Sequence, residues 1–253
     1  MPAVAHPWSA RLLVAALVFY AVAWLAAWVA PRRARWVVAA GALVHVLAMA
    51  GRGWAIGFFP LTNRMESFST AALALALVAA AAWRPSPWFA LPMLALVLAA
   101  LGVALRFPLD LAFPPPLMRT VWYPIHVPLA FAAYALWAAA ATAGLAWAVE
   151  RDPEWLRCLD RWALWGFGLW SLSMIAGGVW GVLAWGAYFL WDPKVMWSVI
   201  LWFHWGTFVH LRWTPSLASR PWLRPALAGV GFLFVLVAYV GTSFLFGRSS
   251  HAF

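Results

Sequence analysis

Long apolar runs alternate with short polar or charged segments along almost the whole chain. Each run is close to the ~20 residues that an α-helix needs to cross a bilayer. The pattern predicts an all-α integral membrane protein with about eight transmembrane helices, forming a single polytopic membrane domain over residues 1–253. The predicted spans are 11–30, 36–55, 67–83, 87–105, 124–149, 162–183, 193–212 and 225–246.

The composition agrees with this pattern. Of the 253 residues, 66% are hydrophobic and only 9% are charged, whereas about a quarter are charged in a typical soluble domain. The net charge is +10, but the basic residues are dispersed between apolar runs. They therefore indicate membrane topology and contacts with the lipid bilayer, and no nucleic-acid partner is expected. The single cysteine, Cys158, excludes an internal disulfide and a Cys-x-x-Cys site.

The basic residues also predict how the chain crosses the membrane. Ten of the 17 Lys and Arg residues fall on one predicted side and seven on the other. The densest short loop, Arg32 to Arg35, lies on the side with ten, which the positive-inside rule makes cytoplasmic. We therefore expect both termini and the loops 51–66, 106–123 and 184–192 to lie outside a bacterial cytoplasmic (inner) membrane.

Several segments carry local structural signals. The Asp-Pro pair at 192–193 predicts an N-cap and the first residue of a new helix. Asn63 and Glu66 have the spacing of a capping box at the start of the third span. The three prolines at 114–116 predict a rigid extended segment that cannot be helical. The charge-dense segment 150–161 is expected to be a solvated cytoplasmic connector.

The most unusual stretch precedes and opens the predicted seventh span. We call residues 184–197 the WWD segment; from Trp185 it reads Trp-Gly-Ala-Tyr-Phe-Leu-Trp-Asp-Pro-Lys-Val-Met-Trp. On composition alone, an aromatic belt at the membrane surface is favoured, because Trp and Tyr have apolar rings with one polar tip. The order of its residues, however, resembles the tryptophan-rich signature of haem-handling proteins in cytochrome c maturation.

Two histidines share the predicted outer face with the WWD segment. His126 lies at the outer end of the fifth span, and His251 lies in the outer tail. Imidazole is a common ligand of haem iron, and aromatic rings can stack on a flat macrocycle. Taken alone, His126 is better explained as a hydrogen-bonded interfacial residue. His251 can be explained as part of a disordered tail.

Three more histidines fall within spans. His210 lies near the cytoplasmic end of the seventh span, while His45 and His204 lie near mid-membrane. An ionisable group in a span is a functional hypothesis, but neutral histidine can also form hydrogen bonds between helices. No Ser-His-Asp set, phosphate loop or carboxylate cluster suggests hydrolytic chemistry.

Together, the motifs resemble the CcsA/ResC-type family of System II cytochrome c biogenesis. Phe189 and Val195 depart from that pattern, because the family has Trp and Glu there. The matching segments are 59–67 (Phe-Pro-Leu-Thr-Asn…Glu-Ser), 125–127 (Ile-His-Val), 185–197, 209–212 (Val-His-Leu-Arg) and 239–251 (Tyr-Val-Gly…His).

The resemblance implies that His126 and His251 are the outer axial ligands of haem b and that His210 is a membrane ligand on the entry side. It implies presentation of haem for covalent attachment to the Cys-x-x-Cys-His motif of apocytochrome c, with a CcsB/ResB-type membrane partner. The protein would be a component of a holocytochrome c synthase (haem lyase), with no catalytic residue assigned and haem export left open. The haem-contacting residues of the WWD segment would be Trp185, Tyr188, Trp191, Asp192 and Trp197.

Three other functions stay open at this point. The first is System I haem delivery to a carrier protein, and the second is a haem-linked regulator or scaffold without ligase activity. The third is a small-molecule transporter whose Trp residues form an ordinary belt. The Asp-Pro-Lys sequence at 192–194 and the eight spans favour System II over System I.

Overall fold

The computed structural model describes residues 6–214 and 219–244. The chain divides into two compact units, Met1–Pro124 and Ile125–Ala252, and each is described by itself. The prediction of one polytopic domain stays a prediction.

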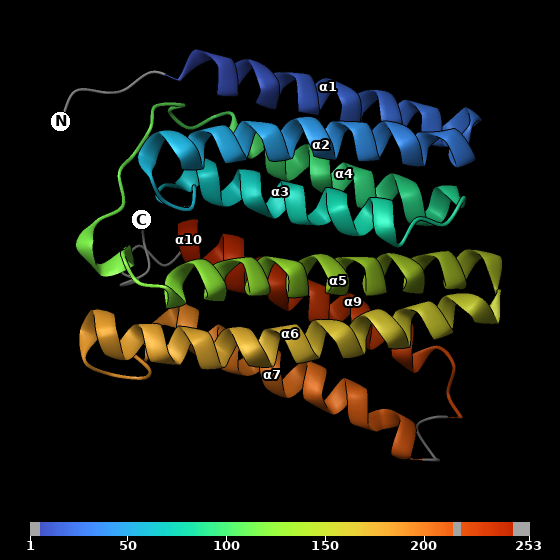
Figure 1. Cartoon of the computed structure of the whole chain (residues 1–253). Coiled ribbons are helices and arrows are strands. Elements are labelled where there is room, and N and C mark those ends of the chain that lie inside the picture. Colours follow the sequence, from blue (N-terminus) through green and yellow to red (C-terminus); the bar gives the residue numbers. More distant parts are fainter. Residues whose placement is uncertain (1–5, 215–218, 245–253) are drawn as a thin grey trace. The chain divides into compact units, whose positions relative to one another are not determined.

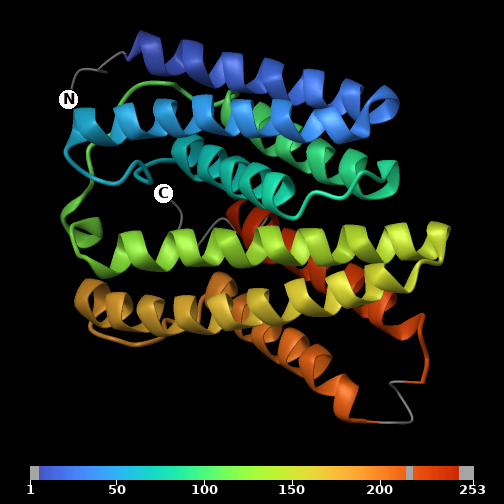
Figure 2. The ribbon, with the colours of Figure 1, turned by 45° about the vertical axis from the view of Figure 1, so that its right-hand side comes forward.

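The first unit is a bundle of four helices (Figures 1 and 2): α1 (Pro7–Val29), α2 (Pro31–Ile56), α3 (Arg64–Ala81) and α4 (Pro87–Ala104). Helices α1 and α3 each pack against both α2 and α4. Proline stands at the start of α1, α2 and α4, where its missing N–H costs no helical hydrogen bond. Helix α2 ends at Ile56, and the next residue has a positive φ of 62° that suits glycine, as Gly57 is.

The second unit contains α6 (Pro153–Trp185), α7 (Pro193–His210) and α9 (Leu223–Leu236), together with most of α5 (Trp122–Glu150). Helix α7 packs against α6 and α9. Helix α9 continues as a π-helical turn, η3 (Val237–Gly241), and then as α10 (Thr242–Phe244). Two short 3-10 turns complete the described elements of the chain, η1 (Pro116–Met118) in the first unit and η2 (Leu211–Trp213) in the second.

Aromatic rings fill the core of the second unit. The indole of Trp137 in α5 stacks on that of Trp205 in α7, with centroids 4.7 Å apart and planes 3° from parallel. Gly166 of α6 leaves room for this pair, because a Cβ there would lie 2.5 Å from Nε1 of Trp137. Stacked aromatic rings bury large apolar areas, so α5, α6 and α7 are held together here.

The all-α membrane fold is confirmed. Within residues 6–214 and 219–244, seven helices are long and apolar enough to cross a membrane. The predicted seventh span is also helical, as α7, but is not among those seven. It carries Lys194, His204 and His210, which reduce its mean hydropathy.

Two local predictions need correction. Most of the predicted connector 150–161 is helical, because Asp152 accepts a hydrogen bond from Glu154 N–H and Pro153 opens α6. This is an ordinary helix start, which the density of charges obscured. In the proline run, Pro115 is extended (ψ 160°), but Pro116 opens η1. The fixed φ of proline is compatible with both conformations.

Candidate functional site

The WWD segment connects α6 to α7. Helix α6 ends at Trp185, and Gly186 follows with a positive φ of 74°. Helix α7 begins at Pro193, and Oδ1 of Asp192 accepts a hydrogen bond of 2.9 Å from the N–H of Val195. The predicted helix start at 192–193 is therefore confirmed, and it gives Asp192 a structural task as the N-cap.

The connecting residues fold back against the end of α6. A Cβ on Gly181 would lie 2.9 Å from the carbonyl oxygen of Ala187, so only glycine allows this approach. The side chains of Tyr188 and Trp191 point away from the protein, at 68% and 72% exposure. Large exposed aromatic rings of this kind provide a surface for an apolar partner.

His126 of α5 is held in a defined orientation. Its Nδ1 donates a hydrogen bond of 2.8 Å to the carbonyl oxygen of Ser173 in α6, and the Ser173 hydroxyl donates one of 2.9 Å to the His126 carbonyl. A carbonyl can only accept, so Nδ1 carries the hydrogen and the lone pair of the neutral ring is on Nε2. A Cβ on Gly177 would lie 2.7 Å from this ring, so α6 is open for it only because residue 177 is glycine.

A chain of rings links His126 to the WWD segment. The imidazole stacks with Trp180 of α6, with centroids 6.2 Å apart and planes 18° from parallel. Trp180 in turn contacts Trp185 edge-on at 4.6 Å. The second unit therefore brings His126 and the start of the WWD segment together through Trp180. Their role as a haem site stays a prediction. His251, the other predicted outer ligand, lies outside the described residues.

The other predicted residues lie along α7. Trp197 packs against Phe234 of α9, with ring centroids 5.7 Å apart. His210 is exposed at the far end of the helix, where Nδ1 donates to the carbonyl of Gly206 at 2.6 Å. The helical rise separates His210 from Asp192 by roughly 25 Å. His210 therefore does not lie beside the WWD segment, and its place at the opposite membrane surface stays a prediction.

The two mid-membrane histidines form hydrogen bonds between helices. In the first unit, His45 of α2 contacts the hydroxyl of Tyr20 at 3.2 Å and that of Ser69 at 2.7 Å. In the second, Nε2 of His204 donates to the carbonyl of Leu227 at 3.0 Å. These contacts agree with the alternative that both histidines are structural residues that form hydrogen bonds between helices.

A buried ion pair lies in the first unit. Arg52 of α2 and Glu66 of α3 are joined at 2.9 Å, and both side chains have 0% exposure. The Arg52 guanidinium also donates to the carbonyls of Leu109 and Asp110, each at 2.8 Å. The second Glu66 oxygen accepts from the N–H and the hydroxyl of Thr62, at 2.9 and 2.8 Å. Both charges are thus surrounded by hydrogen-bond partners, as buried charges require.

The predicted helix cap at Asn63 belongs to the same cluster. Its Oδ1 accepts a hydrogen bond of 2.9 Å from Glu66 N–H, which confirms the N-cap. His6 lies at the other edge of the cluster, where its Nδ1 contacts the buried Ser9 hydroxyl at 2.8 Å. Partial burial, together with the positive charge of Arg52, lowers the pKa of His6 below its ordinary value.

Sequence reasoning did not identify Ser173, Gly177 and Trp180, the residues that position His126. The adjacent glycines at 177–178, within an apolar helix, are a signal of close approach that could have indicated this contact. Among residues 6–214 and 219–244, no group of three or more His, Cys, Asp or Glu gathers as a metal centre.

A family model matches most of this chain, and curated proteins match parts of it. A family model described as "Cytochrome C assembly protein" matches residues 11–248. The chain is 44% identical over 112 residues to the cytochrome c biogenesis protein CcsA of Gloeobacter violaceus, covering 44% of this chain and 32% of that protein. It is 43% identical over 89 residues to CcsA of Porphyra purpurea, covering 35% of this chain and 27% of that protein. The matches thus span about a third or less of these relatives.

A solved structure, "Cytochrome c Heme Lyase CcmF", has the same fold. It aligns with a TM-score of 0.66 at 19% identity, over 96% of this chain and 51% of that one. The resemblance to CcsA-type proteins that the motifs predicted is confirmed by the curated relatives. Since the family model covers nearly the whole chain, the protein belongs to the cytochrome c assembly protein family.

Proposed function

We propose that this protein binds haem b at the end of the second unit that carries His126 and the WWD segment, and presents it for attachment to apocytochrome c. The observation that carries the proposal is the chain of rings from His126 through Trp180 to Trp185. These rings connect a histidine, which is a common ligand of haem iron, to an aromatic surface within one compact unit. The family and the CcmF fold support a role in cytochrome c maturation.

The residues fit a haem ligand in their chemistry. Donation from Nδ1 of His126 to the Ser173 carbonyl is the supporting hydrogen bond that metal-ligating histidines commonly make through their second nitrogen. It selects the tautomer with its lone pair on Nε2, the form that binds iron. Gly177 and Trp180 hold the ring plane, so little orientational freedom is lost on binding.

Bound haem would supply the vinyl groups to which the cysteine thiols of apocytochrome c add. His126 and His251 would hold the iron, and the exposed rings of Tyr188 and Trp191 would bind and orient the macrocycle. The chain's own contribution would then be orientation of the macrocycle and an iron held by two imidazoles. Placement alone can lower a barrier by several kcal/mol, so no general acid or base is assigned.

The remaining parts of the proposal concern location and partners. We place the protein in a bacterial inner membrane with both termini outside, and His210 at the cytoplasmic entry side. The 10 to 7 division of basic residues supports this orientation. A CcsB/ResB-type partner is proposed from the CcsA-type resemblance, and together the two would form the haem lyase.

The test is the optical spectrum of the purified protein with His126→Gly or His251→Gly. Each variant should insert normally, lose the six-coordinate low-spin spectrum and mature little cytochrome c. Free imidazole should partly restore both, because it can occupy the space of the lost ring and ligate the iron. Normal spectra and normal maturation in both variants would contradict the proposal. A wild-type protein without any Soret absorbance, even when haem is supplied, would instead favour a transporter.

A further inference from the structure

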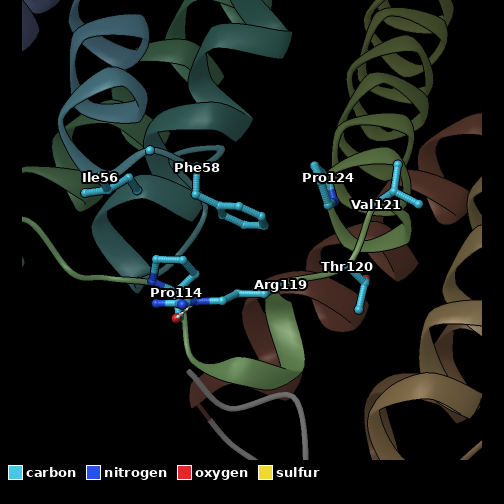
Figure 3. A pocket seen from close by; sticks show the side chains of 8 residues that line it. Ile56, Phe58, Pro114, Arg119, Thr120, Val121 and Pro124 are labelled. Atoms are coloured by element: carbon cyan, nitrogen blue, oxygen red, sulfur yellow. Dashed lines mark hydrogen bonds between the residues drawn. The ribbon is translucent and has the colours of Figure 1, made fainter.

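The first unit contains a cavity of about 470 Å³ (Figure 3). Its volume falls in the range of about 300–1,000 Å³ that is usual for small-molecule sites. It is formed where the end of α2 faces the segment that leads into α5. The residues that matter for its chemistry are Ile56, Phe58, Pro114, Val121, Arg119 and Thr120.

Arg119 is the one charged residue among those that line the cavity. Its side chain reaches toward Pro114 (Figure 3), and its Nε donates a hydrogen bond of 3.0 Å to the Pro114 carbonyl. Within the described part of the chain, this is the only hydrogen bond of the guanidinium. The N–H groups of the two terminal guanidinium nitrogens can therefore donate to a ligand. Their fork geometry matches the two oxygens of a carboxylate.

The walls of the cavity are fixed by the buried polar cluster. Arg52 holds the carbonyls of Leu109 and Asp110, and the Thr62 hydroxyl donates to the carbonyl of Ala112 at 2.7 Å. These bonds tie the segment before Pro114 to α2 and to the start of α3. On the other side, the hydroxyl of Tyr123 donates to the Leu61 carbonyl at 2.8 Å. The cavity is therefore formed before any ligand arrives, which reduces the entropic cost of binding.

Apolar walls with a single fixed guanidinium suit a ligand that has an apolar body and a carboxylate. We propose that this cavity binds the propionate edge of a porphyrin, with Arg119 pairing with the carboxylate and Phe58 and Val121 contacting the ring. This inference rests on the proposed function.

Metal-free protoporphyrin IX is the probe, because it carries both propionates and no iron. Its dimethyl ester, in which both carboxylates are blocked, is the matched ligand. With the full protein in nanodiscs, Arg119→Gln should weaken binding of the acid by about tenfold or more, and leave binding of the ester unchanged. Arg106→Gln, an exposed change in the same connecting segment, should alter neither affinity. Porphyrin fluorescence anisotropy, corrected for empty nanodiscs, gives both dissociation constants.

A second variant tests the cavity itself. Val121 is 67% exposed, so Val121→Trp can be accommodated and should fill the space, weakening the acid and the ester alike. Thermal unfolding of each variant checks that it is folded. Equal effects of Arg119→Gln on acid and ester, or no effect on either, would overturn the inference. So would displacement of the porphyrin by equimolar oleate, which would make the cavity a fatty-acid site.

The two proposals fail in different ways. If the haem spectrum depends on His126 while Arg119→Gln leaves the affinity for metal-free protoporphyrin IX unchanged, only the cavity assignment is wrong. If neither His126→Gly nor His251→Gly alters the haem spectrum, the proposed axial ligation is wrong whatever the probe shows.

Discussion

Arg52 and Glu66 form an ion pair of 2.9 Å that is completely shielded from solvent. Fourteen residues separate them in the sequence, and the pair joins α2 to α3. Removing two charges from water costs several kcal/mol each, which is compensated only when the geometry and the remaining hydrogen bonds are good. Here the carbonyls of Leu109 and Asp110 and both donors of Thr62 complete the cluster.

Glu66→Gln should destabilise the protein strongly, because it leaves the Arg52 charge buried without its counter-ion. Breaking such a pair typically costs about 3–5 kcal/mol. A large drop in the unfolding temperature in detergent is the expected result. Glu154→Gln is the matched control, since its partner Arg157 is 64% exposed, and surface pairs contribute about 1 kcal/mol or less. Equal stability of the two variants would mean that the buried pair is not needed for folding.

Gly177→Ala should reduce haem retention without unfolding the protein. The new methyl group would lie 2.7 Å from the His126 ring, so the imidazole must move from its position against α6. Gly168→Ala is the control in the same helix, because nothing lies within 4 Å of a Cβ there. The readout is the Soret intensity per protein, compared with helix content by circular dichroism. Equal haem content in the two variants would show that the His126 orientation is not required.

Trp191→Ala should reduce haem retention more than Trp36→Ala does. The two side chains are matched in exposure, at 72% and 70%, so the loss of buried area is similar. They differ in place, because Trp36 is in the second turn after the start of α2 and Trp191 is in the WWD segment. Imidazole should not rescue Trp191→Ala, which lacks a surface and not a ligand. A similar decrease in haem retention in both variants would show that the WWD segment is only an aromatic belt at the membrane surface.

His210→Ala should lower haem occupancy at the outer site, if supply passes through the entry side. The residue is exposed and, within the described part of the chain, its Nδ1 donates to Gly206 of its own helix. Little stability should therefore be lost. Haem per protein and the yield of mature cytochrome c are the two measurements. Unchanged values for both would make His210 a structural residue and leave a transmembrane relay without support.

Orientation is tested with topology reporters. A reporter fused after Phe253 should be extracytoplasmic, and one inserted at 150–152 should be cytoplasmic, because of the 10 to 7 division of basic residues. The reverse signals would put His126 and the WWD segment on the cytoplasmic face and end the presentation hypothesis.

The local structure of this protein could be predicted well because its signals are local. Apolar runs of bilayer length located the helices, and the caps at Asp192 and Asn63 were correct to the residue. The main local error was the start of α6. The dense charges there led to the prediction of a connector, although Asp152 and Pro153 signal a helix start. The family resemblance also came from short motifs whose residues are close together in the chain.

The sequence by itself therefore determined the membrane fold, the helix starts at Asn63 and Asp192, and the family, all of which depend on residues within a few turns of each other. Only the tertiary structure decided which side chains meet. It placed His126 against Gly177 and Trp180, 51 and 54 residues later in the sequence, and paired Arg52 with Glu66 out of solvent. These contacts depend on how neighbouring helices pack, and packing is set by the combined shapes of distant segments, which no local pattern of apolar and polar residues encodes.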